Sequence, residues 1–149
     1  MTRSIALLLL SALSCAAAIM TPTQADLDAD LIAAETAWGA HADVASIKWE
    51  RISDCRANDR DRAGWADLAA RTIVINPACR WDAELLQTVV THEYGHLLCY
   101  GVAHSLDKHS AMYYKLLHGQ TVTAEDRNIL RILGATVAAV EKFIPEPVR

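Results

Sequence analysis

The sequence predicts a small α+β domain, and three observations lead to this fold class. The chain has 149 residues, a length that suits one domain better than two. It is 52% hydrophobic and 21% charged, which predicts a folded core and excludes a disordered tail. Short alternating apolar runs are followed, after about residue 80, by apolar residues at helical spacing.

The first 25 residues are predicted to be a secretory signal peptide, so residues 26–149 are assigned to the folded domain. Arg3 precedes an uncharged apolar stretch at residues 5–20, and small residues before Asp26 suit a signal peptidase. The stretch is short for a bilayer, so no stable membrane span is expected. A membrane anchor and a cell-envelope lipoprotein modified at Cys15 stay open as alternatives. We therefore expect a secreted or periplasmic protein.

The first half of the domain is predicted to contain one helix and a short twisted sheet. Apolar residues recur every three or four positions within residues 26–40, with acids in the first turn, which predicts an amphipathic helix. Residues 45–52 alternate and predict a half-buried strand. A charged, turn-rich loop follows at residues 53–64, and two more strands are expected at residues 65–68 and 72–76.

Two helices are predicted in the second half. Residues 81–100 carry a broad apolar stripe at helical spacing, and Gly101 interrupts it. A loop then leads to Thr123, an expected N-cap followed by acids, which opens a helix that runs to Phe143. The sequence has no internal repeat, and we expect a monomer.

The charge balance argues against nucleic-acid partners. Fourteen Lys and Arg stand against eighteen Asp and Glu, and no run of basic residues occurs. Binding to phosphate backbones depends on a basic patch or stripe. No nucleic-acid partner is therefore expected.

Cysteines in an exported chain predict a disulfide. Cys55 and Cys79 lie in the two segments richest in turn-forming residues, and we expect them to pair. That pairing would leave Cys99 without a partner. The alternative is that Cys55 and Cys79 are both small buried apolar residues.

The pattern HExxH occurs at residues 92–96. His92 and His96 differ by about 40° around a helix and lie one turn apart, so both imidazoles can reach one Zn²⁺ ion. Glu93 points a further quarter-turn round, where it can accept a proton from a metal-bound water as the catalytic base. A helix with two incidental histidines is the alternative interpretation.

A catalytic zinc site needs a third protein ligand. A break at Gly101 would allow His104, eight residues after His96, to turn back toward the pair. The predicted ligands are therefore His92, His96 and His104. Cys99, which lies on the metal-facing side of a continued helix, and Asp107 or His109 stay open as substitutes.

With the segment at residues 104–113, which ends in Met-Tyr, this pattern resembles the matrixin-type metzincins, a family of zinc metalloproteases. These enzymes carry HExxHxxGxxH followed by a turn that contains Met, here Met112, although His104 lies two residues further along than in the family. Residues 122–126 resemble the start of the family's C-terminal helix, and residues 73–77 resemble its edge strand. The resemblance covers about residues 72–134.

The resemblance implies a metzincin-like domain with an active-site helix, a Met-turn and a C-terminal helix. It implies a zinc-dependent endopeptidase that acts on peptide or protein substrates with Glu93 as general base. The turn also matches the S-x-M-x-Y pattern of astacins and serralysins, which would make Tyr114 an auxiliary donor instead of an ordinary packed aromatic. The alternative function is a non-catalytic zinc-binding interaction or structural domain.

Overall fold

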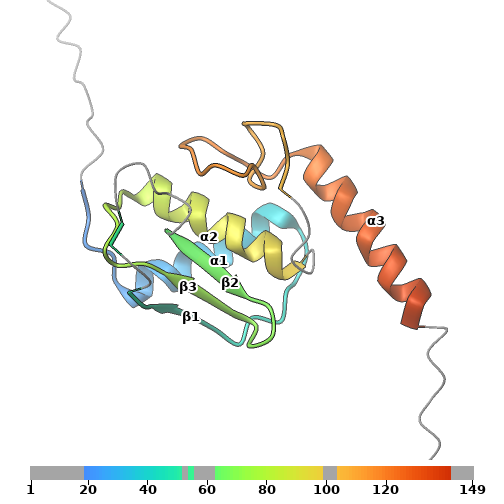
Figure 1. Ribbon diagram of the computed structural model, residues 1–149, viewed down its shortest axis with the longest axis horizontal. Helices are drawn as coiled ribbons and strands as arrows, with labels where there is room; N and C mark the ends of the chain where they lie inside the picture. The colour runs from blue at the N-terminus through green and yellow to red at the C-terminus, as the bar shows by residue number, and fades with distance from the viewer. Residues whose placement is uncertain (1–18, 52–53, 56–62, 99–103, 142–149) are drawn as a thin grey trace, which may run out of the picture.

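The computed structural model describes residues 19–51, 54–55, 63–98 and 104–141 (Figure 1). The described residues form an α+β fold, which confirms the predicted class. Every predicted helix and strand has a counterpart near its expected place. The elements in chain order are α1 (Gln24–Trp38), β1 (Ser46–Trp49), β2 (Gly64–Asp67), β3 (Thr72–Ile75), α2 (Ala83–Leu98) and α3 (Ala124–Glu141).

The three strands form a mixed sheet in the order β1-β3-β2. β1 pairs with β3 in parallel, with Ile47 opposite Ile73, while β2 runs antiparallel, with Ala66 opposite Ile73. The comparison of residues 73–77 with an edge strand is therefore wrong, because β3 is the central strand. All four residues of β3 are buried, as expected for a strand that has hydrogen-bonded neighbours on both sides.

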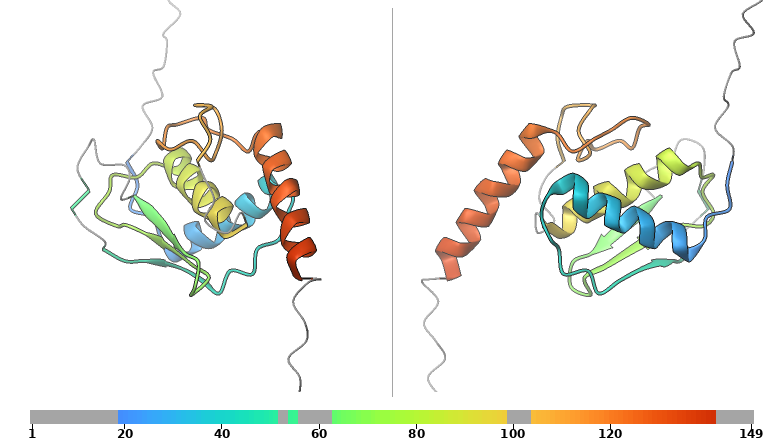
Figure 2. Two further views of the ribbon diagram at one scale, coloured as in Figure 1. Left: turned by 45° about the vertical axis from the view of Figure 1, so that its right-hand side comes forward. Right: turned by 180° about the vertical axis from the view of Figure 1, so that it is seen from behind.

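Helices α1 and α2 lie side by side and pack against the sheet (Figures 1 and 2). The indole N–H of Trp38 in α1 donates to the carbonyl of Thr91 in α2 at 2.9 Å. The hydroxyl of Tyr94 accepts from the amide of Ala42 at 2.7 Å and donates to the carbonyl of Ala40 at 3.0 Å. These bonds join α2 to the end of α1 and the segment after it, and they satisfy polar groups inside the core.

Strand β2 approaches α2 closely at Gly64. A Cβ atom at this position would lie 2.8 Å from Cγ1 of Val89 and 3.1 Å from the carbonyl oxygen of Val74. The first distance is too short for a real Cβ contact and the second is tighter than most, so glycine permits this contact between strand and helix. The contact places β2 directly beside the helix that carries the HExxH pattern.

The chain contacts the domain before the predicted start at residue 26. The amide of Met20 donates to the carbonyl of Trp81 at 2.9 Å. Thr23 is the N-cap of α1: its hydroxyl accepts from the amide of Asp26 and its own amide donates to the Asp26 carboxylate, which together form a capping box. Processing after residue 25 would remove Met20 and Thr23, and with them the cap of α1.

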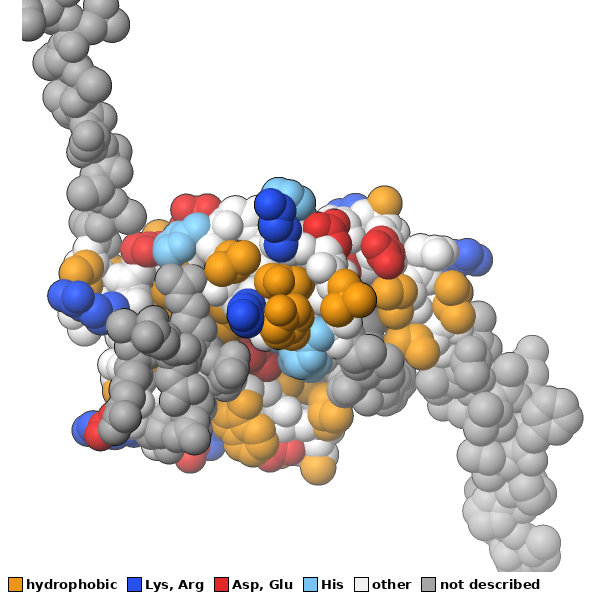
Figure 3. Space-filling model, turned by 45° about the horizontal axis from the view of Figure 1, so that its top comes forward, with side chains coloured by type: hydrophobic (Ala, Val, Ile, Leu, Met, Phe, Trp, Pro, Cys, Tyr) orange, Lys and Arg blue, Asp and Glu red, His pale blue; other side chains and the backbone are white. Residues whose placement is uncertain are grey.

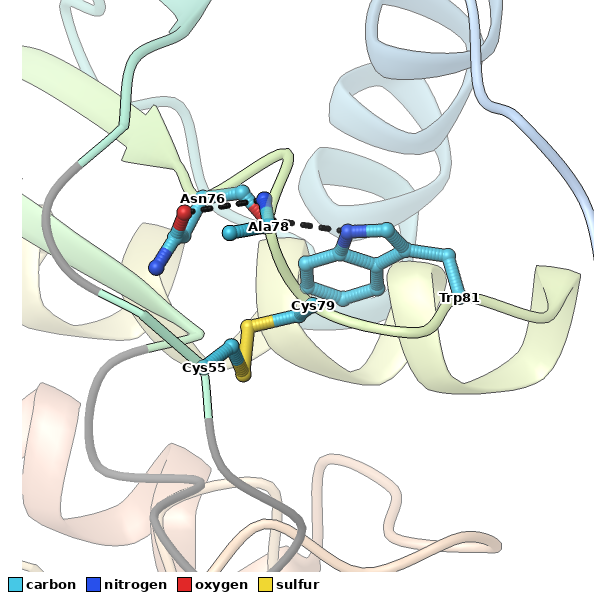
Figure 4. Close-up of a disulfide and its surroundings, with 5 residues drawn as sticks. All are labelled: Cys55, Asn76, Ala78, Cys79 and Trp81. Atoms are coloured by element: carbon cyan, nitrogen blue, oxygen red, sulfur yellow. Dashed lines mark hydrogen bonds between the residues drawn. A yellow bond between two sulfur atoms is a disulfide. The ribbon is translucent and has the colours of Figure 1, made fainter.

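A disulfide joins Cys55 to Cys79, as predicted (Figure 4). Beside it, the indole N–H of Trp81 donates to the carbonyl of Asn76 at 3.0 Å, and the amide of Ala78 donates to the Asn76 side chain at 3.0 Å. These bonds fold the segment between β3 and α2 into a tight turn. The bridge is consistent with an oxidising, extracellular location.

Helix α3 leads away from the rest of the domain and follows the loop that begins at residue 104 (Figure 2). Leu130 packs against the core. No helix in the described part of the chain is long and apolar enough to cross a membrane. Five residues named in the sequence predictions lie outside the described residues: Arg3, Cys15, Cys99, Gly101 and Phe143.

Candidate metal centre

The structure brings together the three histidines predicted as ligands. His92 and His96 project from successive turns of α2, and their Nε2 atoms are 3.0 Å apart. His104 comes from the loop after α2, and the nearest ring nitrogens of all three lie within 4.8 Å of one another. These three side chains could hold a metal ion.

The substitutes considered for the third ligand do not join this group where the structure describes them. Asp107 and His109 are exposed in the loop, and the carboxylate of Asp107 accepts from the backbone amide of His109 at 2.9 Å. Cys99 lies outside the described residues. Within the described ranges, His104 is thus the candidate that the fold brings to the pair on α2.

The ring of His92 is oriented by the loop that crosses α2. Its Nδ1 lies 2.6 Å from the carbonyl oxygen of Ala111 and must donate to it. In a neutral ring, the lone pair is then on Nε2, the atom that faces His96. A carbonyl or carboxylate partner on the second ring nitrogen is the usual way in which a metal-binding histidine is oriented.

Burial keeps the helical pair uncharged. It lowers the pKa of His92 from 6.5 to about 4 and that of His96 to about 3. Neutral imidazole nitrogens are a donor type that zinc prefers. Ligand nitrogens on a tetrahedral zinc ion lie about 3.3 Å apart, close to the spacing of the His92 and His96 nitrogens. The donor type and spacing of the helical pair are therefore compatible with a zinc ion, and His104 lies near enough to be a third ligand.

Met112 packs against α2 on the side where the loop crosses it. Met112 is buried, and a Cβ atom at Gly95 would collide with its Sδ and with the indole of Trp38. Glycine inside the HExxH pattern is therefore a packing requirement, because the loop and α1 both approach the helix backbone there. The Met112 contact holds the loop beside both helical histidines.

A buried bond between Ser110 and Asp126 was not predicted from the sequence. The Ser110 hydroxyl donates to the Asp126 carboxylate at 2.6 Å and accepts from the Met112 amide at 2.9 Å. The same carboxylate accepts from the amide and hydroxyl of Thr123, the residue before α3. The sequence identified Asp126 only as an acid behind an N-cap, since nothing local indicates a partner sixteen residues earlier.

Glu93 lies in the same cleft as the three histidines. Its side chain is buried, and the lack of solvent raises its pKa to about 8, although the backbone amide of Ala66 opposes this shift. A nearby cation would favour the ionised form, because opposite charges stabilise each other. Glu93 is therefore a titratable group in a position to exchange a proton with a cleft ligand.

The cleft has a volume of about 510 Å³ and opens to solvent. Figure 3 shows histidine and acidic side chains in the middle of this face, with hydrophobic side chains on both sides of them. Residues from β2 and just after it line one wall, and residues 114–116 line the other. Tyr114 lines the cleft and is half exposed. Its role as an auxiliary donor stays a prediction.

The fold and the site together define a small α+β domain with a candidate three-histidine metal centre. No known family model matches the chain, and no curated protein matches it. We therefore base the functional interpretation on the residues of the site and their geometry.

Proposed function

We propose that the protein is an exported zinc-dependent endopeptidase. The observation that supports this most strongly is the combination of three convergent imidazoles with the buried carboxyl of Glu93 in one open cleft. Hydrolytic zinc sites typically combine three protein ligands, a free coordination position and a general base. The metzincin-like pattern in the sequence supports the same class of reaction.

His92, His96 and His104 would hold the zinc ion, which supplies Lewis-acid activation of water and of the scissile carbonyl when bound. Glu93 would accept a proton from the attacking water and deliver it to the leaving amine. The Ala111 carbonyl would keep the His92 ring in place during these steps.

A peptide is the substrate class that suits the shape of the site. In the described part of the chain, β2 pairs on one side only, with β3, and it lines the cleft. An extended peptide can add to such an open strand edge through main-chain hydrogen bonds. Such pairing would draw the peptide backbone along the cleft above the histidines.

The test compares the zinc-loaded wild type with Glu93→Gln, which keeps the shape of the side chain but removes its basicity. We expect one zinc per chain in both proteins. Cleavage of a peptide library should fall by orders of magnitude in Glu93→Gln. Equal cleavage by the two proteins would contradict the role of Glu93, and His104→Ala with full zinc content would contradict the ligand set.

The second candidate is a non-catalytic domain that uses zinc to stabilise a small core. The open cleft and Glu93 argue against it, because structural zinc sites usually close the fourth position with a protein ligand. A chelator separates the two functions. Removal of a catalytic ion should abolish cleavage while circular dichroism still shows the folded domain, whereas removal of a structural ion should unfold the chain.

A further inference from the structure

One wall of the cleft carries a basic side chain that the proposed reaction does not use. Lys115 lies between Tyr114 and Leu116, and all three line the cleft. Among the described lining residues, Lys115 is the only Lys or Arg. The cleft therefore presents one positive side chain beside the histidines, in a chain whose net charge is -4.

The backbone around Lys115 is held firmly. Leu116 is buried in the core. The buried side chain of Gln120 donates to the carbonyl of Lys115 at 2.8 Å and accepts from the amide of Leu117 at 2.9 Å. Because the side-chain N–H and C=O groups of Gln120 both bond to the backbone of one short loop, the backbone position of Lys115 in the cleft wall is fixed.

The ammonium group of Lys115 is placed over an aromatic ring and has no acidic partner among the residues that the structure describes. Its Nζ lies 5.4 Å from the ring centroid of Tyr114, within the range of a cation–π contact. Within the described residues, no carboxylate forms an ion pair with it. The charge is therefore available to a ligand in the cleft.

The wall of the cleft opposite Lys115 carries apolar side chains. Trp65 and Leu68 line the opposite wall and are both partly exposed, although each has a large hydrophobic side chain. A bound peptide would thus meet apolar surface on one side and the Lys115 ammonium on the other. A carboxylate on that peptide would be attracted, and a basic side chain would be repelled.

We propose that Lys115 is a specificity-determining residue that selects peptides carrying a carboxylate at the position facing residues 114–116. This inference rests on the proposed function, because it assumes that a peptide binds in the cleft. The carboxylate could belong to an Asp or Glu side chain or to the C-terminus of the peptide. The experiment below distinguishes these two sources.

Binding is measured with zinc-loaded Glu93→Gln, which prevents turnover. The probes are fluorescent Ala–Leu peptides with an amidated C-terminus, in which one Glu, Gln or Lys is moved through every position. At one position we expect the Glu peptide to bind about 1.5-fold to fivefold more tightly than the Gln peptide, the range for a solvent-exposed ion pair. The Lys peptide should bind more weakly than the Gln peptide. The Glu preference should shrink in 0.5 M salt.

Lys115→Met in the same background should abolish the Glu preference, and Lys115→Glu should reverse it in favour of Lys. Lys108→Met is the matched control, because Lys108 is exposed in the same loop region but does not line the described cleft. This control should keep the full preference. A Gln peptide with a free C-terminus tests the second source, and tighter binding than its amidated form would assign the carboxylate to the peptide end.

Equal binding of Glu, Gln and free-carboxylate peptides at every position would overturn the inference. So would a preference that survives in Lys115→Met, or a set in which no peptide binds. The proposed peptidase activity fails separately. If the wild type cleaves no peptide while the charge preference is present and depends on Lys115, the endopeptidase is refuted and the role of Lys115 in binding is supported.

Discussion

The orientation of His92 depends on a chain of contacts that begins in α3. The Ala111 carbonyl accepts from its Nδ1, and the neighbouring Ser110 hydroxyl is held by the buried carboxylate of Asp126. Each contact fixes the position of the next. A hydroxyl on a loop and an acid at the start of a helix therefore bear on the geometry of a candidate metal ligand.

Ser110→Ala tests this chain of contacts. It removes the bonds to Asp126 and to the Met112 amide, so we expect zinc affinity to fall about tenfold in competition with a chromophoric chelator. Ser46→Ala is the matched control, because its hydroxyl bonds to Thr72 in the sheet, away from the site. Equal zinc affinity in the two variants would show that Ser110 does not position His92.

Asp30 is expected to destabilise the domain at neutral pH. Partial burial, with a smaller contribution from the charge of Asp26, raises its pKa from 3.8 to about 6. The unfolded chain therefore releases this proton more readily than the folded chain. The favourable contribution of protonated Asp30 to the free energy of unfolding is complete below pH 3.8 and is lost as the pH rises through about 6.

Asp30→Asn should consequently raise the free energy of unfolding at pH 7.5 by about 1 kcal/mol, a figure reduced for the exposure of the side chain. The difference from the wild type should vanish at pH 3, as measured by urea denaturation at both pH values. Asp43→Asn, at an exposed position, serves as the control. A gain that is the same at both pH values would contradict the explanation.

At the scale of elements, helix α2 is closely packed against its neighbours at two glycines. Strand β2 approaches it at Gly64, and the loop after residue 104 and α1 approach it at Gly95. The two glycines lie at the contacts that place β2 and Met112 against the helix. The local sequence around the candidate metal centre therefore also serves packing.

Gly95→Ala should both destabilise the domain and weaken zinc binding. The added methyl group would collide with Met112 and Trp38, and overpacking of this kind costs about 1–3 kcal/mol. Gly134→Ala in α3 is the control, because a Cβ atom there meets nothing within 4 Å. That change should be neutral or slightly stabilising in thermal denaturation. Equal melting temperatures for the two variants would contradict the packing argument.

The start of α1 leads to a prediction about the N-terminus. A chain that begins at Asp26 lacks the Thr23 cap and the Met20 bond to Trp81, whereas a chain that begins at Ile19 keeps both. We expect the shorter chain to be less stable by about 1–2 kcal/mol in urea denaturation. Thr23→Ala in the longer chain should reproduce part of this loss, and no loss in either protein would contradict the role of the cap.

For the whole molecule, the disulfide connects the segment before β2 to the turn before α2. The bridged cysteines are separated by 24 positions, so the bond restricts the unfolded chain substantially. We expect Cys55→Ser/Cys79→Ser to lose about 3 kcal/mol of stability, measured by chemical denaturation under oxidising conditions. Zinc stoichiometry should be unchanged, because the histidines come from other segments. An unchanged denaturation midpoint would contradict this prediction.

Local sequence patterns were sufficient for the elements and for most of the candidate site. Alternation and helical spacing predicted the strands and helices, because these periods follow directly from backbone geometry. The i and i+4 positions of His92 and His96 placed them on one face for the same reason. The Cys55–Cys79 pairing followed from the turn residues around both positions.

Contacts between segments distant in sequence were decided only by the tertiary structure. Three features depend on segments that are far apart in the chain. They are the central position of β3, the bond from Ser110 to Asp126, and the close packing of Met112 and Trp38 against Gly95. The approach of His104 to the helical pair belongs to the same class, since a loop has no period from which its path can be calculated. Side-chain type and local spacing determine what a segment can form, while packing in three dimensions determines which segments meet.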